Sequence, residues 1–104
     1  MNDCYQENDD WSQITHLVIE GTVKRIGNKC FSEMNQIQTI ELKEGIEIIG
    51  SGSFQGLKIK EIIIPSSVRL IQTKAFANCF ELERVVFTEQ SQIERIEEFA
   101  FENT

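Results

Sequence analysis

The sequence predicts an α/β repeat solenoid, a right-handed coil with a parallel β-sheet on one face and short second strands and short helical turns on the other. Three observations support this fold class. The pattern Ixx[IL]x[IL] occurs four times, at starts separated by 23, 22 and 23 residues. A second pattern, [VI]xxI, follows each copy, and a phenylalanine comes five residues after its closing isoleucine. Such self-similarity at a fixed period is typical of solenoids.

The first apolar pattern of each copy predicts a β-strand. Its last residues alternate with period 2 and are rich in β-branched side chains, as half-buried strands are. No copy is long enough to bury its own apolar face, so copies must stack, and stacking makes the sheet parallel. The four stretches are ITHLVI (14–19), IQTIEL (37–42), IKEIII (59–64) and LERVVF (82–87).

The second pattern predicts a shorter strand or an extended turn, and the residues after it predict a helical turn that carries a phenylalanine inward. A small residue precedes each phenylalanine, which indicates tight packing there. The second patterns are VKRI (23–26), IEII (46–49), VRLI (68–71) and IERI (93–96), and the phenylalanines are Phe31, Phe54, Phe76 and Phe101. The fourth copy departs from the rest by two additional residues in the segment TEQSQ.

These boundaries divide the chain into an acidic N-terminal tail or cap, 1–13, and four repeats at 14–36, 37–58, 59–81 and 82–104. Trp11 lies three residues before Ile14, as Met34 lies before Ile37. We therefore interpret Trp11 as a cap over the first coil; the alternative is an exposed tryptophan in an unstructured tail. The last repeat ends at Thr104 with no comparable cap. Either the chain is a fragment of a longer array, or its open coil pairs with a second copy, and we favour a homo-oligomer.

Charge and hydropathy exclude several classes of partner. The 104 residues carry 17 acidic and 10 basic side chains, a net charge of −7, so a phosphate backbone would be repelled and we expect no nucleic-acid partner. No apolar stretch approaches the roughly 18 residues that span a bilayer, so we expect no membrane insertion. No signal peptide is seen, which leaves a cytoplasmic location, prior removal of a signal, or export by another route.

Residues that carry chemistry are few, and we predict a protein that is not an enzyme and binds neither metal nor cofactor. Three cysteines and one histidine lack zinc-ligand spacing, and ENDDW lacks the spacing of a calcium loop. No cysteine occupies the position equivalent to His16 in the other repeats, and no serine lies in a strained elbow motif, so we expect no catalysis by His16. We expect Cys30 and Cys79 to be small buried residues in different columns, too far apart to pair, and Cys4 to be an exposed thiol.

The outward face of the long strands is the predicted partner-binding site. Three of the four residues that lie between the inward ones are aliphatic, whereas a solvated sheet face is usually polar. The alternative is that β-propensity alone selects them. The neighbouring outward column is polar, and we expect ion pairs between Glu20 and Lys43 and between Glu61 and Arg84. The predicted site residues are Val18, Glu41, Ile63, Val86, His16, Thr39, Glu61 and Arg84.

The third repeat, IKEIIIPSSVRLIQTKAFANCFEL from Ile59 to Leu82, resembles the BspA-like leucine-rich repeats, and the resemblance covers about residues 14–104. The family implies a leucine-rich-repeat solenoid that is displayed at a cell surface or secreted and acts in adhesion. The implied partner is a host-matrix or cell-surface protein. The alternative function is a structural segment that self-assembles through an open terminal coil or the sheet face. Repeats one and two depart from the third by having Glu20 and Lys43 in place of Pro65.

Overall fold

The computed structural model of the chain describes residues 13–104. The predicted Trp11 cap and the predicted exposed thiol of Cys4 lie outside the described residues.

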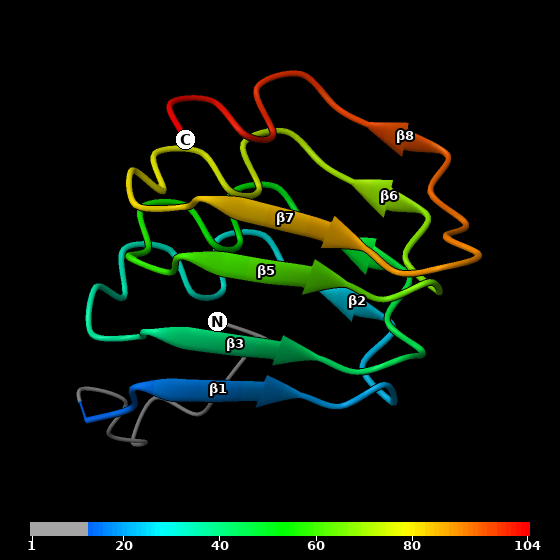
Figure 1. Cartoon of the computed structure of the whole chain (residues 1–104), viewed down its shortest axis with the longest axis horizontal. Coiled ribbons are helices and arrows are strands. Elements are labelled where there is room, and N and C mark those ends of the chain that lie inside the picture. Colours follow the sequence, from blue (N-terminus) through cyan, green and yellow to red (C-terminus); the bar gives the residue numbers. More distant parts are fainter. Residues whose placement is uncertain (1–12) are drawn as a thin grey trace.

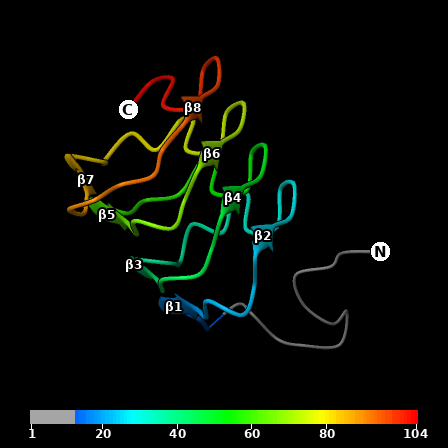
Figure 2. The same cartoon turned by 90° about the vertical axis from the view of Figure 1, so that its right-hand side faces the viewer.

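The described chain is a β-solenoid of about four coils, each with one long and one short strand (Figures 1 and 2). The long strands run side by side across the front in Figure 1, and the short strands lie behind them. The long strands are β1 (His16–Ile19), β3 (Thr39–Leu42), β5 (Glu61–Ile64) and β7 (Arg84–Phe87). The short strands are β2 (Arg25–Ile26), β4 (Ile48–Ile49), β6 (Leu70–Ile71) and β8 (Arg95–Ile96).

All strand pairs are parallel, as the repeat pattern predicts, but the two sets of strands pair differently. The short strands form one sheet in the order β2-β4-β6-β8. The long strands form two separate pairs, β1 with β3 and β5 with β7, and no ladder joins β3 to β5. The expectation of one continuous sheet on the long-strand face is therefore wrong at its middle.

The core consists of side chains that stack on their equivalents in the next coil. Inward residues of β1, β3 and β5 alternate with exposed ones, as half-buried strands require. Four phenylalanine rings form a column, with centroid separations of 5.7, 5.3 and 5.2 Å from Phe31 through Phe54 and Phe76 to Phe101. Phe54 and Phe76 are fully buried. The predicted inward phenylalanines are thus confirmed.

The prediction of helical turns is wrong, since no helix occurs among residues 13–104. Each turn donates alternate backbone N–H groups to the next coil, as from Phe31 to the Ser53 carbonyl at 2.9 Å, which leaves no continuous helical ladder. The backbone is also left-handed at two points per turn, with φ of 64° at Gly52 and 79° at Gly56. Residues in this conformation cannot continue a right-handed helix.

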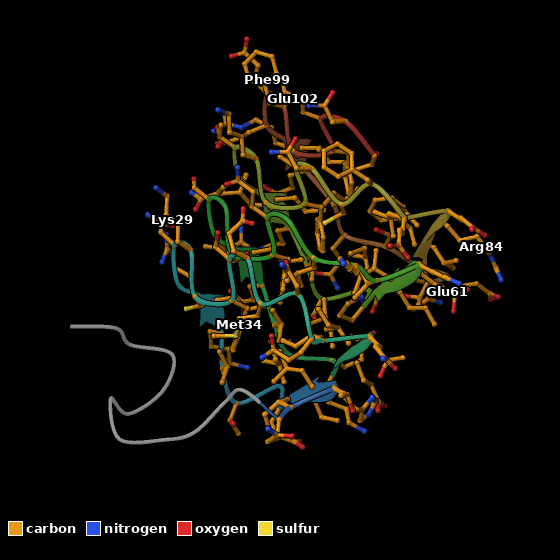
Figure 3. The ribbon with its side chains drawn as sticks, turned by 90° about the vertical axis from the view of Figure 1, so that its left-hand side faces the viewer. Lys29, Met34, Glu61, Arg84, Phe99 and Glu102 are labelled. Atoms are coloured by element: carbon orange, nitrogen blue, oxygen red, sulfur yellow. The ribbon has the colours of Figure 1, made fainter. Side chains whose placement is uncertain are left out.

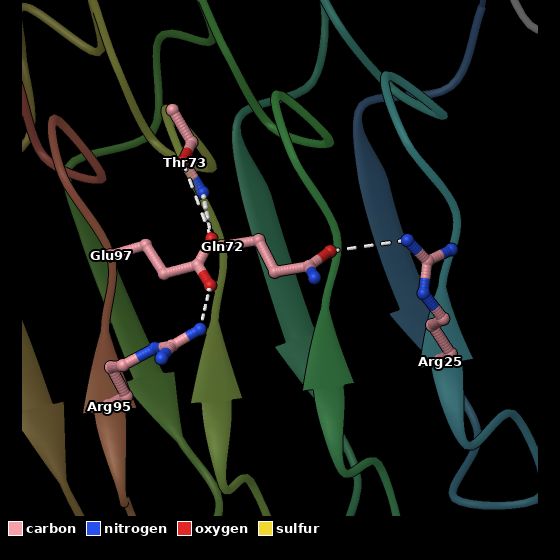
Figure 4. A network of polar contacts seen from close by, with 5 residues as sticks. All are labelled: Arg25, Gln72, Thr73, Arg95 and Glu97. Atoms are coloured by element: carbon pink, nitrogen blue, oxygen red, sulfur yellow. Dashed lines mark hydrogen bonds and ion pairs between the residues drawn. The ribbon is translucent and has the colours of Figure 1, made fainter.

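Polar side chains cross-link the short-strand sheet over its whole width. Lys24, Glu47, Arg69 and Glu94 occupy one column, and Arg69 lies 3.6 Å from Glu47 and 3.7 Å from Glu94. Figure 4 shows a second set of contacts, in which Arg25 donates to Gln72 two coils away, at 3.2 Å. These exposed pairs are each worth about 0–1 kcal/mol, so they fix register more than they stabilise the fold.

The phenylalanine column generates a stability prediction. Replacing Phe54 by alanine removes a ring that is buried between two others, so we expect the free energy of unfolding to fall by about 3–5 kcal/mol. Phe99 is 49% exposed and is the matched control; its replacement by alanine should change stability by less than about 0.5 kcal/mol. Urea unfolding followed by circular dichroism measures both. Equal losses would contradict the stacked core.

Candidate binding surface on the long strands

The eight predicted site residues all lie on the outward face of the long strands, in two columns. Parallel register places His16 beside Thr39 and Glu61 beside Arg84, and the second column places Val18 beside Glu41 and Ile63 beside Val86. Ile63 is 48% exposed and Val18 38%, and Val86 is half-buried. The break between β3 and β5 divides these residues into a lower block, on β1 and β3, and an upper block, on β5 and β7.

In the lower block the outward side chains are mostly polar. His16 Nδ1 and Thr39 Oγ1 share a hydrogen bond across the two strands. Lys43, the residue after β3, pairs with Glu41 of that strand at 3.1 Å, so the expected pair between Glu20 and Lys43 is wrong. Both members of that ion pair are about half exposed, and water screens their attraction. A single exposed aliphatic side chain, Val18, remains in this block.

In the upper block an apolar pair lies beside a charged pair. Arg84 Nη1 lies 2.9 Å from Glu61 Oε2, which confirms the expected ion pair, and Figure 3 shows both side chains projecting together from the outer face. Ile63 and Val86 are direct neighbours in the second column. The upper block is therefore an aliphatic pair with a neutralised charge at its side, an arrangement typical of a contact patch.

The break between the blocks begins where the chain leads into β5. Ile37 lies six positions after Phe31 and Leu82 six positions after Phe76, but Ile59 lies only five positions after Phe54. The missing position lies between Leu57 and Lys58, where the other coils have Asn35 and Phe80.

A turn hydrogen bond is lost with that residue. Ile37 donates to Met34 at 3.1 Å and Leu82 to Cys79 at 3.0 Å, whereas Ile59 makes no such bond. The shorter connection therefore brings the chain into β5 differently from the way it enters β3 and β7. This difference accounts for the lost pairing at the start of the strand.

Pro65 removes a second link at the far end of β5. In the equivalent positions Lys43 donates its backbone N–H to Ile19 at 3.0 Å and Thr88 donates to Ile64 at 3.3 Å. Proline has no N–H to donate, so the corresponding bond to β3 cannot form. Pro65 is buried, and its ring ends the strand.

In place of that backbone hydrogen bond, the Glu44 carboxylate stabilises the turn after Pro65. It accepts hydrogen bonds from the backbone N–H of Ser66 at 2.8 Å and of Ser67 at 3.2 Å, and from the Ser66 hydroxyl. The backbone bond from Ser66 is the largest of the effects that lower the pKa of Glu44. These contacts tie the second coil to the third at the turn, beyond the break.

A pocket of about 550 Å³ opens at the break, within the size range of ligand sites. Thr39 and Ile40 of β3 line one side, and Glu61 and Ile63 of β5 line the other. The remaining lining residues come from the turns that lead into the strands: Asn35, Gln38, Lys58, Lys60 and Glu81. Sequence reasoning missed this pocket, although the 22-residue spacing between the second and third repeats was its signal.

A second hollow, of about 390 Å³, adjoins the first on the turn side. The two share Asn35, Lys58 and Glu81, so they form one groove that runs around the edge of the strands. Phe80 lines the second hollow and is 76% exposed. We name this surface, from Ile63 to Phe80, the corner groove.

Groups that could hold a metal ion do not gather in the described part of the chain. No three histidine, cysteine or acidic side chains form a metal-ligand group within residues 13–104. Cys79 is a free, buried thiol whose pKa is raised by burial, and its Sγ donates to the Phe54 carbonyl at 3.2 Å. Cys30 is buried, but it is disulfide-bonded, so its interpretation as a simple packing residue is incomplete. None of the described residues forms a helix that could cross a membrane.

The chain is similar to known proteins in sequence and in structure. The family model described as "BspA type Leucine rich repeat region (6 copies)" matches residues 4–104. The solved structure of the pneumococcal vaccine antigen PcpA is 30% identical, with a TM-score of 0.80 over 86% of this chain and 22% of that chain. A leucine-rich repeat protein from Bacteroides ovatus is 24% identical, with a TM-score of 0.48 over 79% of this chain and 30% of that chain. No curated protein matches significantly.

The break generates a prediction for amide exchange. In a parallel strand, alternate residues direct their backbone groups to opposite neighbours. The backbone N–H of Thr39 donates to the Thr15 carbonyl of the first coil, and that of Arg84 donates to the Lys60 carbonyl of the third coil. By this alternation, the N–H groups of Ile40, Glu61 and Ile63 are directed into the break. We expect these three amides to exchange with deuterium far faster than those of Ile62 and Ile64 in native-state NMR. Equal protection along β5 would contradict an open sheet.

Proposed function

The chain belongs to the BspA-type leucine-rich repeat family, and from this premise we propose that it is a non-enzymatic protein-binding module. The proposed contact surface is the outward face of the long strands, centred on the upper block. The proposed role is adhesion or recognition at a host or cell surface. The similarity to a pneumococcal vaccine antigen supports this role, although this chain spans 22% of that protein's length.

The observation that carries the proposal is the exposed aliphatic pair of β5 and β7. Ile63 is 48% exposed on a face where inward positions already supply the core, so folding does not require a large apolar residue there. Val86 lies beside it in register, and the Glu61–Arg84 ion pair lies at its edge. Apolar anchors with a polar rim are the usual centres of protein interfaces.

The lower block supports the proposal less. Its His16–Thr39 and Glu41–Lys43 pairs offer polar contacts that water satisfies equally well in the free protein. We therefore assign His16, Val18, Thr39 and Glu41 to the rim of the proposed site and Ile63 and Val86 to its centre. Self-assembly through the same face is the alternative function, and it would bury the same pair.

Replacing Ile63 by lysine tests the proposal. Because the side chain faces outward, the unfolding midpoint should stay close to that of the unchanged protein, while capture of partners from cell-surface and matrix extracts should be lost. Phe99→Lys, a change at a residue of similar exposure in the last coil, should retain binding. Retained binding by Ile63→Lys would contradict the assigned surface, and loss of folding would show that Ile63 belongs to the core.

Light scattering after size exclusion distinguishes self-assembly from binding of a different protein. Self-assembly predicts a mass that rises with concentration and that Ile63→Lys returns to that of one chain. A single-chain mass at every concentration would exclude assembly through this face.

A further inference from the structure

The two ends of the solenoid differ in how far their apolar side chains are covered. Ile96 lies on β8, the last strand of its sheet, and is 44% exposed. Its equivalent in the first coil, Ile26, is only 2% exposed, and Phe31 of the same coil is 5% exposed. Yet no strand of residues 13–104 pairs with the outer edge of β1 or β2. The face of the first coil that points away from the second, its underside, is therefore buried without a cover from those residues.

A disulfide at this end of the molecule indicates which segment is attached there. Cys30 lines one hollow together with Ile26 and Phe31, and it is disulfide-bonded. The chain has three cysteines, and Cys79 is a free, buried thiol. Within one chain, this leaves Cys4 as the partner of Cys30.

The register of the repeat is compatible with this pairing. The first two repeats are 23 residues apart, and the same distance counted back from Gly27 leads to Cys4. Gly27 and Cys30 belong to one turn, in which the Cys30 N–H donates to the Gly27 carbonyl at 3.4 Å. The match to the family model also begins at residue 4. The register therefore brings Cys4 to the turn that carries Cys30.

The charges of the two parts are also complementary. The first coil, 14–36, has three basic side chains (Lys24, Arg25 and Lys29) and two acidic ones (Glu20 and Glu33). The segment 1–12 has no basic side chain and four acidic ones, which are Asp3, Glu7, Asp9 and Asp10. Opposite net charges favour contact between this segment and the coil.

We propose that residues 1–12 form a strap over the underside of the first coil, held there by a disulfide between Cys4 and Cys30. The strap adds a covalent link to the interpretation of Trp11 as a cap, and it replaces the expectation of an exposed Cys4 thiol. It does not rest on the proposed function, because the upper block lies on the third and fourth coils.

The strap depends on the redox state of its surroundings. When it forms, two thiols lose two protons and two electrons to an oxidant such as oxidised glutathione, whose own disulfide becomes two thiols. A dithiol reductant breaks the S–S bond, returns a proton to each sulfur and is itself oxidised to a cyclic disulfide. Disulfides persist in oxidising environments and are rare in the cytosol, so the strap is closed where a cell-surface protein would act.

Peptide mapping tests the link. The 104-residue protein is equilibrated with oxidised glutathione, alkylated in denaturant without reduction, and digested with trypsin. We expect Met1–Lys24 to be joined to Cys30–Lys43, with Cys79 alkylated and the undigested protein at the mass of a single chain. Three alkylated cysteines, or a link between two chains, would overturn the proposal.

The covering role is tested by the single tryptophan, Trp11, which lies within the strap. On reduction with dithiothreitol, its fluorescence should shift to longer wavelength, and the unfolding midpoint should fall by about 10 °C or more. Cys4→Ser should show these values without reductant and no further response to it. The matched control, Cys79→Ser, should retain the redox response. Unchanged fluorescence and midpoint on reduction, or a response that Cys4→Ser retains, would overturn the strap.

Discussion

The column of four phenylalanine rings sets how each coil lies on the next. Its centroids are 5.7, 5.3 and 5.2 Å apart, and the buried aliphatic ladders on either side follow the same repeat. No coil buries these side chains alone, so stability arises between neighbours rather than within a unit. The turns and the short-strand sheet keep this spacing through backbone bonds from coil to coil.

This stacking determines which part of the structure changes in response to the shorter second repeat. Displacing a buried phenylalanine from the column would cost about 3–5 kcal/mol, whereas each backbone hydrogen bond that is exchanged for water costs only about 0.5–1.5 kcal/mol. The shorter connection after Phe54 therefore opens the exposed long-strand face between β3 and β5 and leaves the core intact. The corner groove and the separation of the site into two blocks both follow from this outcome.

Sequence periodicity correctly predicted the coils, the parallel direction of the strands and the inward columns, because each depends on side-chain type at a fixed spacing. It correctly placed Ile63 outward and beside Val86, and Glu61 beside Arg84. It failed at the turns, where helical segments were expected, because left-handed residues such as Lys29 and Glu33 are not distinguished by hydropathy. It also missed Lys58 and Lys60, because a missing residue changes backbone pairing without changing the apolar pattern.

The central claim is that one absent residue and one proline open the sheet between β3 and β5. The direct test inserts an asparagine between Leu57 and Lys58, to match Asn35, and replaces Pro65 by threonine, to match Thr88. Deuterium exchange by NMR should then show the amides of Glu61 and Ile63 protected to the level of Ile62 and Ile64. If the altered protein folds with its phenylalanine column intact and those amides still exchange rapidly, the account is contradicted.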